Sequence, residues 1–226
     1  MRRLSTVAVI VFGLLAGTAA ALWLARRGPF RSPAADAAPA DLSKAAPGAE
    51  PPHARGGGAP GAVTLEEFAD FQCPPCGRLH PGLKQVEEEY GARLRVVFRH
   101  LPLEGIHDHA RGAAEAAEAA ALQGKFWEMH DLLFERQGEW PLVEPARPVF
   151  VEYARRLGLD AERFARDLDA PQPRERVAAD VRRADTARVA ATPTLFLEGR
   201  ELSAGELTPE GLRAAVEAAL GARATR

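Results

Sequence analysis

Apolar residues at strand and helix spacing mark the start of a folded domain near residue 63. Residues 63–69 (VTLEEFA) alternate in polarity and are rich in strand-forming side chains. A helix is predicted next, because apolar residues recur at i, i+4, i+7 and i+11: Leu79, Leu83, Val86 and Tyr90. Gly91 ends this helix, and residues 94–99 (LRVVFR) alternate again. The pattern predicts a strand, a helix and a second strand joined by a parallel crossover.

Helical patterns dominate the middle of the chain. Residues 110–122 are rich in alanine, and apolar residues recur at helical spacing over 126–133 and 150–157. Asp160 is a suitable N-cap for another helix, and apolar residues near 177–181 indicate one more. We therefore expect several consecutive helices here.

Strand character returns near the C-terminus. Residues 194–197 (TLFL) predict a strand, and the turn at 198–200 leads into a short hairpin. Thr208 as N-cap, followed by Pro209, opens a last helix that extends through Leu220. The order βαβ, several helices, ββα indicates an α/β fold.

Residues 1–27 have the pattern of a membrane-directed segment. An uncharged run over 4–25 lies between two pairs of arginines, and a helix of this length crosses a hydrocarbon core of roughly 30 Å. The small residues 19–21 also suit the cleavage site of a secretory signal. We favour an uncleaved signal anchor, with a cleaved signal peptide as the alternative.

Residues 28–61 change to proline, alanine and glycine with scattered charge. Such a segment has too few large apolar side chains to offset the entropy lost on ordering. We therefore predict a disordered tether over 28–61 and a folded domain over 62–222.

Composition narrows the possible functions. The 226 residues include 29 Lys and Arg against 31 Asp and Glu, a formal net charge of −2 at pH 7. This balance gives no support for nucleic-acid binding, which needs a basic surface. Two cysteines are too few for a disulfide-rich miniprotein or a four-thiolate zinc site.

The two cysteines, Cys73 and Cys76, form a C-x-x-C motif where the first strand gives way to the helix. A helix N-terminus favours thiolate at Cys73, and Cys76 lies about one turn later, where it can attack a mixed disulfide. Pro74 and Pro75 lack amide hydrogens, so the Cys76 amide is the local donor to the Cys73 sulfur. The motif predicts a redox-active pair.

A C-x-x-C motif also serves other roles in proteins. Covalent haem attachment is excluded, because Gly77 stands where that motif needs histidine. Zinc bound by Cys73, Cys76, His80 and a further histidine stays an alternative, although nothing in the sequence specifies the fourth ligand. An inert structural disulfide is the other alternative, but a bridge over so short a loop constrains the unfolded chain little.

Four runs of sequence together resemble the DsbA-like thiol-disulfide oxidoreductases of the thioredoxin superfamily, in their membrane-anchored or secreted bacterial branch. The runs are EEFADFQCPPCGRLHP, VVFRHLPL, IHDHARGAAEAAEAAALQGKFWEMHDLLFE and VAATPTLFLEGREL. The resemblance implies a thioredoxin-like fold, βαβ…ββα, with a helical domain inserted at about 103–188.

The resemblance also assigns roles to individual residues. Pro193 matches the family's cis-proline that faces the active cysteines, and Thr192 would offer its backbone to an extended substrate peptide. We expect Pro74 and Pro75 to contact the substrate as well. Glu67 matches the family's buried acid, whose raised pKa would suit it to relay the Cys76 proton; a solvated acid at the strand end is the alternative.

Other residues are harder to assign. Pro75 stands where the family often has a histidine, which puts oxidising strength in doubt. His80 is expected at the helix surface. Four further residues match the family pattern, and we assign them only packing or capping roles: His107, His109, Trp127 and His130.

The predicted function is oxidation of cysteine pairs in polypeptides of the cell envelope through a Cys73–Cys76 disulfide, outside the cytoplasm. A reductase or isomerase of the same fold is one alternative, and a non-catalytic tethered binding or chaperone module with structural or zinc-bound cysteines is another. We expect a monomer that needs no cofactor or metal beyond the redox disulfide. The resemblance implies a membrane redox partner linked to quinone.

Overall fold

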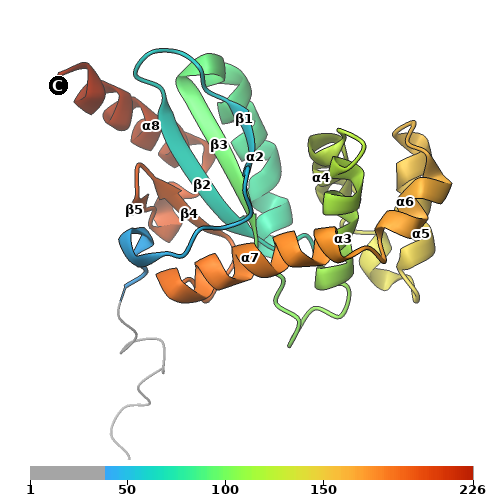
Figure 1. Ribbon diagram of the computed structural model, residues 1–226. Helices are drawn as coiled ribbons and strands as arrows, with labels where there is room; N and C mark the ends of the chain where they lie inside the picture. Colours follow the sequence, from blue (N-terminus) through green and yellow to red (C-terminus); the bar gives the residue numbers. More distant parts are fainter. Residues whose placement is uncertain (1–38, 226) are drawn as a thin grey trace, which may run out of the picture. The chain divides into compact units, whose positions relative to one another are not determined.

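The computed structural model describes residues 39–225 (Figure 1). The predicted signal anchor over 1–27 and the first part of the predicted tether, 28–38, lie outside the described residues. None of the helices between residues 39 and 225 combines the length and hydrophobicity needed to span a membrane.

A five-stranded sheet forms the centre of the domain, with the strand order β1-β3-β2-β4-β5. The strands are β1 (His53–Gly56), β2 (Val63–Ala69), β3 (Leu94–His100), β4 (Thr194–Leu197) and β5 (Arg200–Glu201). The pairing of β2 with β3 is parallel, whereas β1, β4 and β5 join the sheet antiparallel. The predicted strands and the parallel crossover are therefore confirmed.

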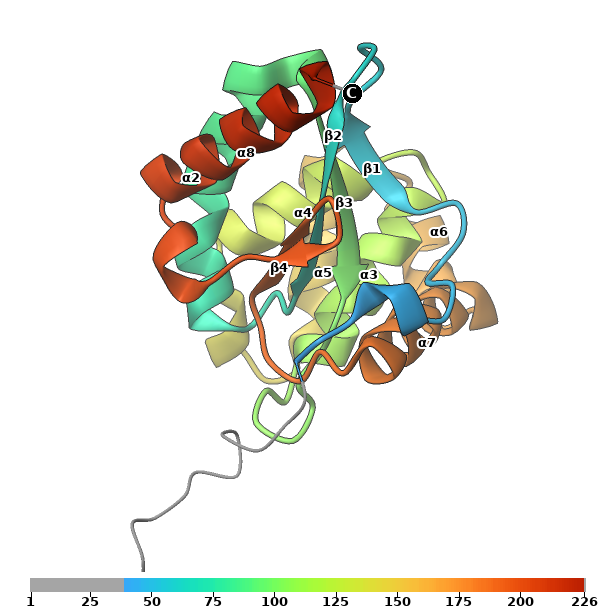
Figure 2. The same ribbon diagram turned by 90° about the vertical axis from the view of Figure 1, so that its left-hand side faces the viewer.

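Two helices, α2 (Pro74–Tyr90) and α8 (Pro209–Ala224), lie side by side on one face of this sheet (Figures 1 and 2). The predicted apolar stripe of α2 packs there against β2 and α8. Gly91 ends α2 with a φ of 50°, a conformation that glycine adopts without steric cost. Thr208 caps α8 by accepting a hydrogen bond from the Gly211 amide, as predicted.

A run of helices separates β3 from β4. They are α3 (Ala110–Ala121), α4 (Phe126–Glu135), α5 (Arg147–Arg156), α6 (Ala161–Asp167) and α7 (Pro171–Ala187). Asp160 caps α6, as its position predicted. The order βαβ, helices, ββα is thus present, and β1 precedes it.

The helices between β3 and β4 contribute to two apolar cores. The first core joins α3 to α6 with Cys73, Cys76 and Phe98. The second lies on the face of the sheet opposite α2, where α7 packs on Phe68 and Phe196. The two cysteines of the C-x-x-C motif therefore contribute to the core of the helical part, although they lie at the start of α2.

Residues 39–61 are ordered, which corrects the prediction of a disordered tether for this segment. Residues 53–56 form β1, and Ala49 is buried. The Ala49 amide donates to Asp180, and its carbonyl accepts from Arg99. The segment is held by backbone hydrogen bonds to other parts of the domain, and composition does not reveal such partners.

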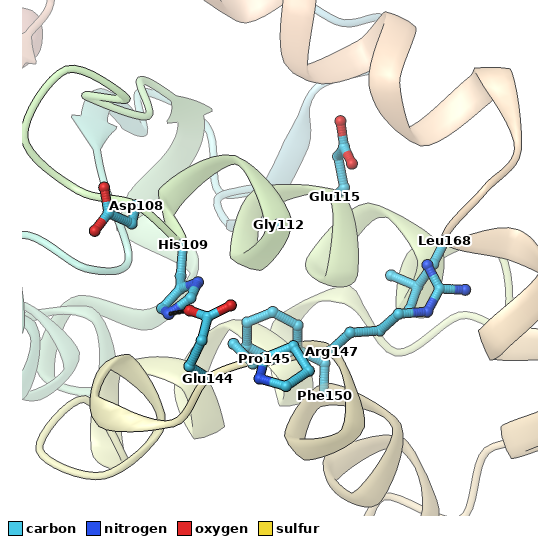
Figure 3. Close-up of a pocket in the computed structure, with 10 residues that line it drawn as sticks. Asp108, His109, Gly112, Glu115, Glu144, Pro145, Arg147, Phe150 and Leu168 are labelled. Atoms are coloured by element: carbon cyan, nitrogen blue, oxygen red, sulfur yellow. Dashed lines mark ion pairs between the residues drawn. The ribbon is translucent and has the colours of Figure 1, made fainter.

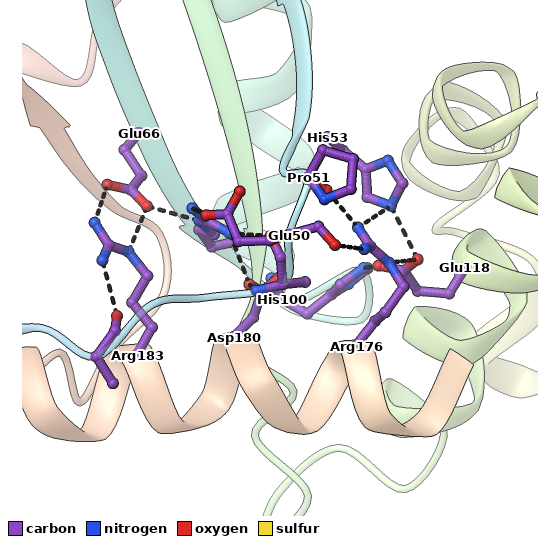
Figure 4. Close-up of polar contacts among 12 residues, drawn as sticks. Glu50, Pro51, His53, Glu66, His100, Glu118, Arg176, Asp180 and Arg183 are labelled. Atoms are coloured by element: carbon purple, nitrogen blue, oxygen red, sulfur yellow. Dashed lines mark hydrogen bonds and ion pairs between the residues drawn. The ribbon is translucent and has the colours of Figure 1, made fainter. Parts of the chain in front are cut away.

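The buried carboxylate of Glu118 connects the end of the 39–61 segment to the helices. Glu118 is buried, and its carboxylate contacts His53, His100 and Arg176 at 2.9, 3.1 and 2.7 Å. Arg176 also donates to the carbonyl of Pro51, so one guanidinium joins the segment to α3 and α7 (Figure 4). Burial opposes ionisation of Glu118, but the hydrogen bonds from the two histidines outweigh it and hold its pKa well below the ordinary value.

Candidate active site

Cys73 occupies the N-cap position of α2, so its side chain lies at the end of the helix where amide hydrogens are unpaired. Its amide donates to the carbonyl of Asp70 at 3.1 Å, which closes the turn that follows β2. Cys76 is fully buried and Cys73 is 4% exposed, whereas Pro74 and Pro75 are exposed. The two prolines therefore form the outer surface of the motif.

The segment before β4 meets the first cysteine, although about 120 residues separate them. The Cys73 thiol donates to the carbonyl of Thr192 at 3.4 Å. The Thr192–Pro193 peptide bond is cis, as the resemblance implied, and both residues are partly exposed. The fold thus brings together four of the predicted site residues: Cys73, Cys76, Thr192 and Pro193.

The two thiols differ sharply in acidity. A hydrogen bond from the Cys76 thiol is the main cause that lowers the pKa of Cys73 to about 6; the Thr192 side chain and the Cys76 amide add to this effect, and burial opposes it. Burial raises the pKa of Cys76 far above that of a free thiol. At neutral pH this arrangement favours a thiolate at Cys73 and a thiol at Cys76, which suits Cys73 to be the nucleophile.

Glu67 lies on β2 and is 3% exposed. Its cross-strand neighbours are Phe98 on β3 and Leu195 on β4, both apolar. Burial, reinforced by the charge of Glu87, raises the pKa of Glu67 to about 8. The charge of Glu67 also contributes to the raised pKa of Cys76, so the two groups are coupled electrostatically.

Two residues of the site were not identified from the sequence. Asp70 is buried, and its carboxylate accepts hydrogen bonds from Gln72, Leu103 and His107 at 2.7, 2.9 and 2.7 Å. Gln137, which follows α4, donates to the carbonyls on either side of Gln72. The position of Asp70 beside the motif was a usable signal, but nothing local marks Gln137.

His80 is buried, which corrects the prediction of a surface position. Its ring stacks on Phe134 of α4 at a centroid separation of 5.0 Å and meets His130 edge-on at 5.4 Å. Burial lowers the pKa of His80 and lowers that of His130 to about 3, so both favour the neutral form. Helix α4 covers this side of α2, and a pattern read along α2 alone cannot show that.

These two histidines and Asp131 have possible metal-ligating atoms within 4.8 Å of one another. Asp131 is already paired with Lys84 at 2.9 Å and with Arg55 at 3.0 Å. Two cationic side chains on the single carboxylate disfavour a divalent ion. Within residues 39–225 neither cysteine belongs to a cluster of this kind, so the geometry gives no support to the zinc alternative.

A pocket of about 240 Å³ opens between the start of α3 and the segment before α5 (Figure 3). His109 and Glu144 point toward one another there, at 3.2 Å, beside Phe150. The His109 amide donates to the side chain of Gln72, the residue before Cys73. The pocket wall is therefore continuous with the active-site turn.

Comparison with known proteins gives consistent results for the fold. The thioredoxin family model matches residues 51–218. Oxidised BdbD from Bacillus subtilis is similar in structure, with a TM-score of 0.66 and 20% identity over 79% of this chain and 99% of that one. A thioredoxin-like oxidoreductase from Silicibacter pomeroyi has a TM-score of 0.61 and 26% identity over 74% and 91% of the two chains. DsbA from Xylella fastidiosa has a TM-score of 0.58 and 22% identity over 73% and 90%.

Curated sequences similar to this chain include much longer proteins. A Na⁺/H⁺ antiporter, NhaA 3 from Salinispora tropica, is 45% identical over 164 residues, which are 73% of this chain and 24% of that protein. NhaA 1 from Salinispora arenicola gives 45% identity over 70% and 23%. The chain thus spans about a quarter of the length of these relatives, and their name describes the whole proteins.

Proposed function

The chain belongs to the thioredoxin family and has the fold of its DsbA-like oxidoreductases, and on this premise we propose that it oxidises cysteine pairs of polypeptides outside the cytoplasm. One observation carries the proposal. Cys73, whose pKa is lowered, and Cys76, whose pKa is raised, lie about one helical turn apart at the start of α2. Cys73 also contacts the segment that contains the cis-proline. This is the arrangement that thiol-disulfide exchange requires.

The reaction begins with Cys73 and Cys76 joined as a disulfide. A substrate thiolate attacks the sulfur of Cys73, forming a mixed disulfide and releasing Cys76 as a thiolate that takes up a proton. A second substrate thiolate then attacks the substrate sulfur of this mixed disulfide. The substrate leaves oxidised, and Cys73 leaves as a thiolate, so two electrons pass from the substrate to the cysteine pair.

Glu67 is the proposed source of the proton for Cys76. Its pKa of about 8 keeps the carboxyl protonated at neutral pH, and the buried Cys76 sulfur is the group that most disfavours a charge. Transfer of the proton from Glu67 to the leaving sulfur removes that charge. In this role Glu67 acts on a reacting atom, as predicted from the sequence.

The direction of exchange depends on the relative stability of the reduced and the oxidised protein. The hydrogen bonds to Cys73 stabilise its thiolate and hence the reduced protein, and a protein with a stable reduced form is an oxidant. We propose a membrane redox partner as the acceptor of its electrons, and an anchor over residues 1–27 that holds the domain at the membrane. In the alternative of a reductase the exchange runs in the opposite direction, and in that of an isomerase substrate disulfides are rearranged without net electron transfer.

Titration of the Cys73 thiolate tests the catalytic proposal. We expect its ultraviolet absorbance to rise with a midpoint near pH 6, and we expect Cys73→Ser to lose both this transition and disulfide exchange with a reduced model peptide. Cys76→Ser is the comparison variant: it keeps the Cys73 thiol and therefore a thiolate transition, but it removes the thiol that is the main donor to Cys73 and cannot form the intramolecular disulfide. A midpoint near 8.5 in a wild-type protein without exchange activity would favour the non-catalytic alternative.

The reduction potential separates oxidant from reductase. Equilibration with glutathione should give a value near the DsbA end of the known range, about −120 mV. A value near that of thioredoxin, about −270 mV, would contradict the oxidising direction. In the Cys76→Ser variant the mixed disulfide cannot be resolved by the second cysteine, so trapped partners would identify the substrate polypeptides.

A further inference from the structure

The chain after α4 meets the active-site turn through one side chain. The Gln137 side-chain amide donates to the carbonyl of Phe71 and to that of Cys73, each at 2.8 Å. Both hydrogens of one NH₂ group are thus used on carbonyls two residues apart. Gln137 is partly buried, and its own amide donates to Phe134 at the end of α4.

Gly77 makes this contact possible. A β-carbon at position 77 would lie 2.2 Å from the side-chain oxygen of Gln137 and 2.7 Å from its amide carbon, far inside contact distance. The Gly77 amide also donates to the Cys73 carbonyl at 3.2 Å, so that one carbonyl accepts from both residues. Gly77 and Gln137 therefore hold the backbone of Cys73 together.

The position of this carbonyl matters for the sulfur of the same residue. Pro74 and Pro75 have no amide hydrogen, so within the first turn of α2 only the Cys76 amide is left to approach the Cys73 sulfur. Gln137 holds the carbonyl end of that turn from the segment that follows α4. Any rotation of the Cys73 peptide would move the sulfur relative to both its Cys76 donors and the Thr192 segment.

From this geometry we propose that Gln137 is a positioning residue for the Cys73 thiolate, which it stabilises through the backbone of Cys73 and through the space left by Gly77. The inference deepens the function proposed above and rests on it. Gln137 touches no reacting atom. It makes the acidity of the nucleophile depend on the docking of α4 against the turn.

The test compares two glutamines in the full chain. Gln137→Met keeps the length of the side chain and removes both donors; we expect the midpoint of the Cys73 titration to rise by about half a unit or more, a threefold change in the ionisation constant. The reduction potential should become more negative, because the reduced form loses stability. Gln123→Met is the matched control, since Gln123 makes two comparable bonds to the backbone of Asp160, away from the site.

A second variant tests the contact from its other side. Gly77→Ala should displace the Gln137 side chain and shift the titration in the same direction. In a Gln137→Ala background the same change meets an empty space, so we expect no additional shift there. Such coupling between the two positions is what a double-mutant cycle measures.

The outcomes distinguish this inference from the proposed function. A raised midpoint in Gln137→Met with an unchanged one in Gln123→Met supports the positioning role. Equal thermal destabilisation of both variants without any change of midpoint overturns it and leaves Gln137 a structural residue. An inactive wild type with an ordinary thiol pKa overturns the proposed function instead, while the difference in pKa between wild type and Gln137→Met still decides the role of Gln137.

Discussion

Glu66 and Glu67 are adjacent carboxylates on β2; both are buried, but they face opposite sides of the sheet and their surroundings differ. Glu66 faces α7 and accepts from Arg99 at 2.7 Å and from Arg183 at 2.7 and 2.8 Å (Figure 4). Burial opposes its ionisation, but the two arginines outweigh burial and lower its pKa. Glu67 faces α2, and its carboxylate forms no hydrogen bond or ion pair with any residue between 39 and 225.

The strand itself does not explain this difference. Cross-strand neighbours are apolar on both faces: Val97 and Phe196 flank Glu66, and Phe98 and Leu195 flank Glu67. The charged groups on each face decide: Arg99 of β3 and Arg183 of α7 supply cations beside Glu66, whereas the α2 side of the sheet is lined mainly by apolar side chains. One carboxylate is therefore a structural anion, whereas the other is left with a pKa of about 8, close to physiological pH.

The largest expected effect comes from removing Arg99, the cation that pairs with both Glu66 and Asp180. Arg99 is buried and also contacts Asp180 at 3.0 Å and the carbonyl of Ala49 at 2.9 Å. Arg99→Ala would leave two buried carboxylates with fewer partners, at an expected cost of about 3–5 kcal/mol in the free energy of unfolding. Urea denaturation measures it. The exposed pair of Arg213 and Glu89 provides the control, because Arg213→Ala should give no measurable loss.

Glu67→Gln is expected to have the next largest effect, with a distinctive dependence on pH. The folded pKa of Glu67 is raised from 4.5 to about 8, so its contribution to stability is complete below about pH 4.5 and is lost as the pH rises toward 8. Relative to Glu67→Gln, the wild type should lose about 1.4 kcal/mol per pH unit in this window, or about 3 kcal/mol between pH 5 and pH 7. If the free energies of unfolding of the two proteins changed in parallel over this pH range, Glu67 would be ionised in the folded state throughout, and its pKa would not be raised.

Glu66→Gln should have a smaller effect on stability, and its dependence on pH should be opposite to that of Glu67→Gln. Glu66 has a lowered pKa, so its contribution to stability is present above about pH 4.5 and is lost as the pH falls. Replacement by the neutral amide should destabilise the protein by about 1.5–3 kcal/mol at pH 7, since two arginines lose a charged acceptor. The difference from the wild type should shrink in unfolding experiments below pH 4. If Glu66→Gln were as stable as the wild type at pH 7, the two faces would not differ as described.

These two glutamates also show which features a local sequence pattern can predict. The alternation along residues 63–69 puts Glu67 in phase with Val63 and Leu65 and puts Glu66 on the opposite face; in the structure Val63 and Leu65 lie in the core beside α2, whereas Glu66 pairs with Arg183 of α7. Strand alternation is a local property with a period of two, so it needs no knowledge of the partners. The partners of Glu66 are 33 and 117 residues away, and no local pattern could supply them.

The same reason explains the errors. His80 was expected on the surface, because its burial depends on α4, some fifty residues later. Residues 39–61 were expected to be disordered, because proline, alanine and glycine offer little apolar surface. Arg99, Asp180 and Arg183 order this segment through its backbone, which every sequence has in common.

The sequence by itself determined the redox motif, the order of elements and the faces of the strands, because each rests on spacing or on a local pattern, whereas the cis-proline position was implied by the family resemblance. Only the tertiary structure decided the chemistry of the individual groups. The acidity of Cys73 and Glu67 depends on burial and on donors from distant segments, and these come into contact only when the chain folds. Gln137 is the clearest case, since its two hydrogen bonds to the active-site turn span more than sixty residues of sequence.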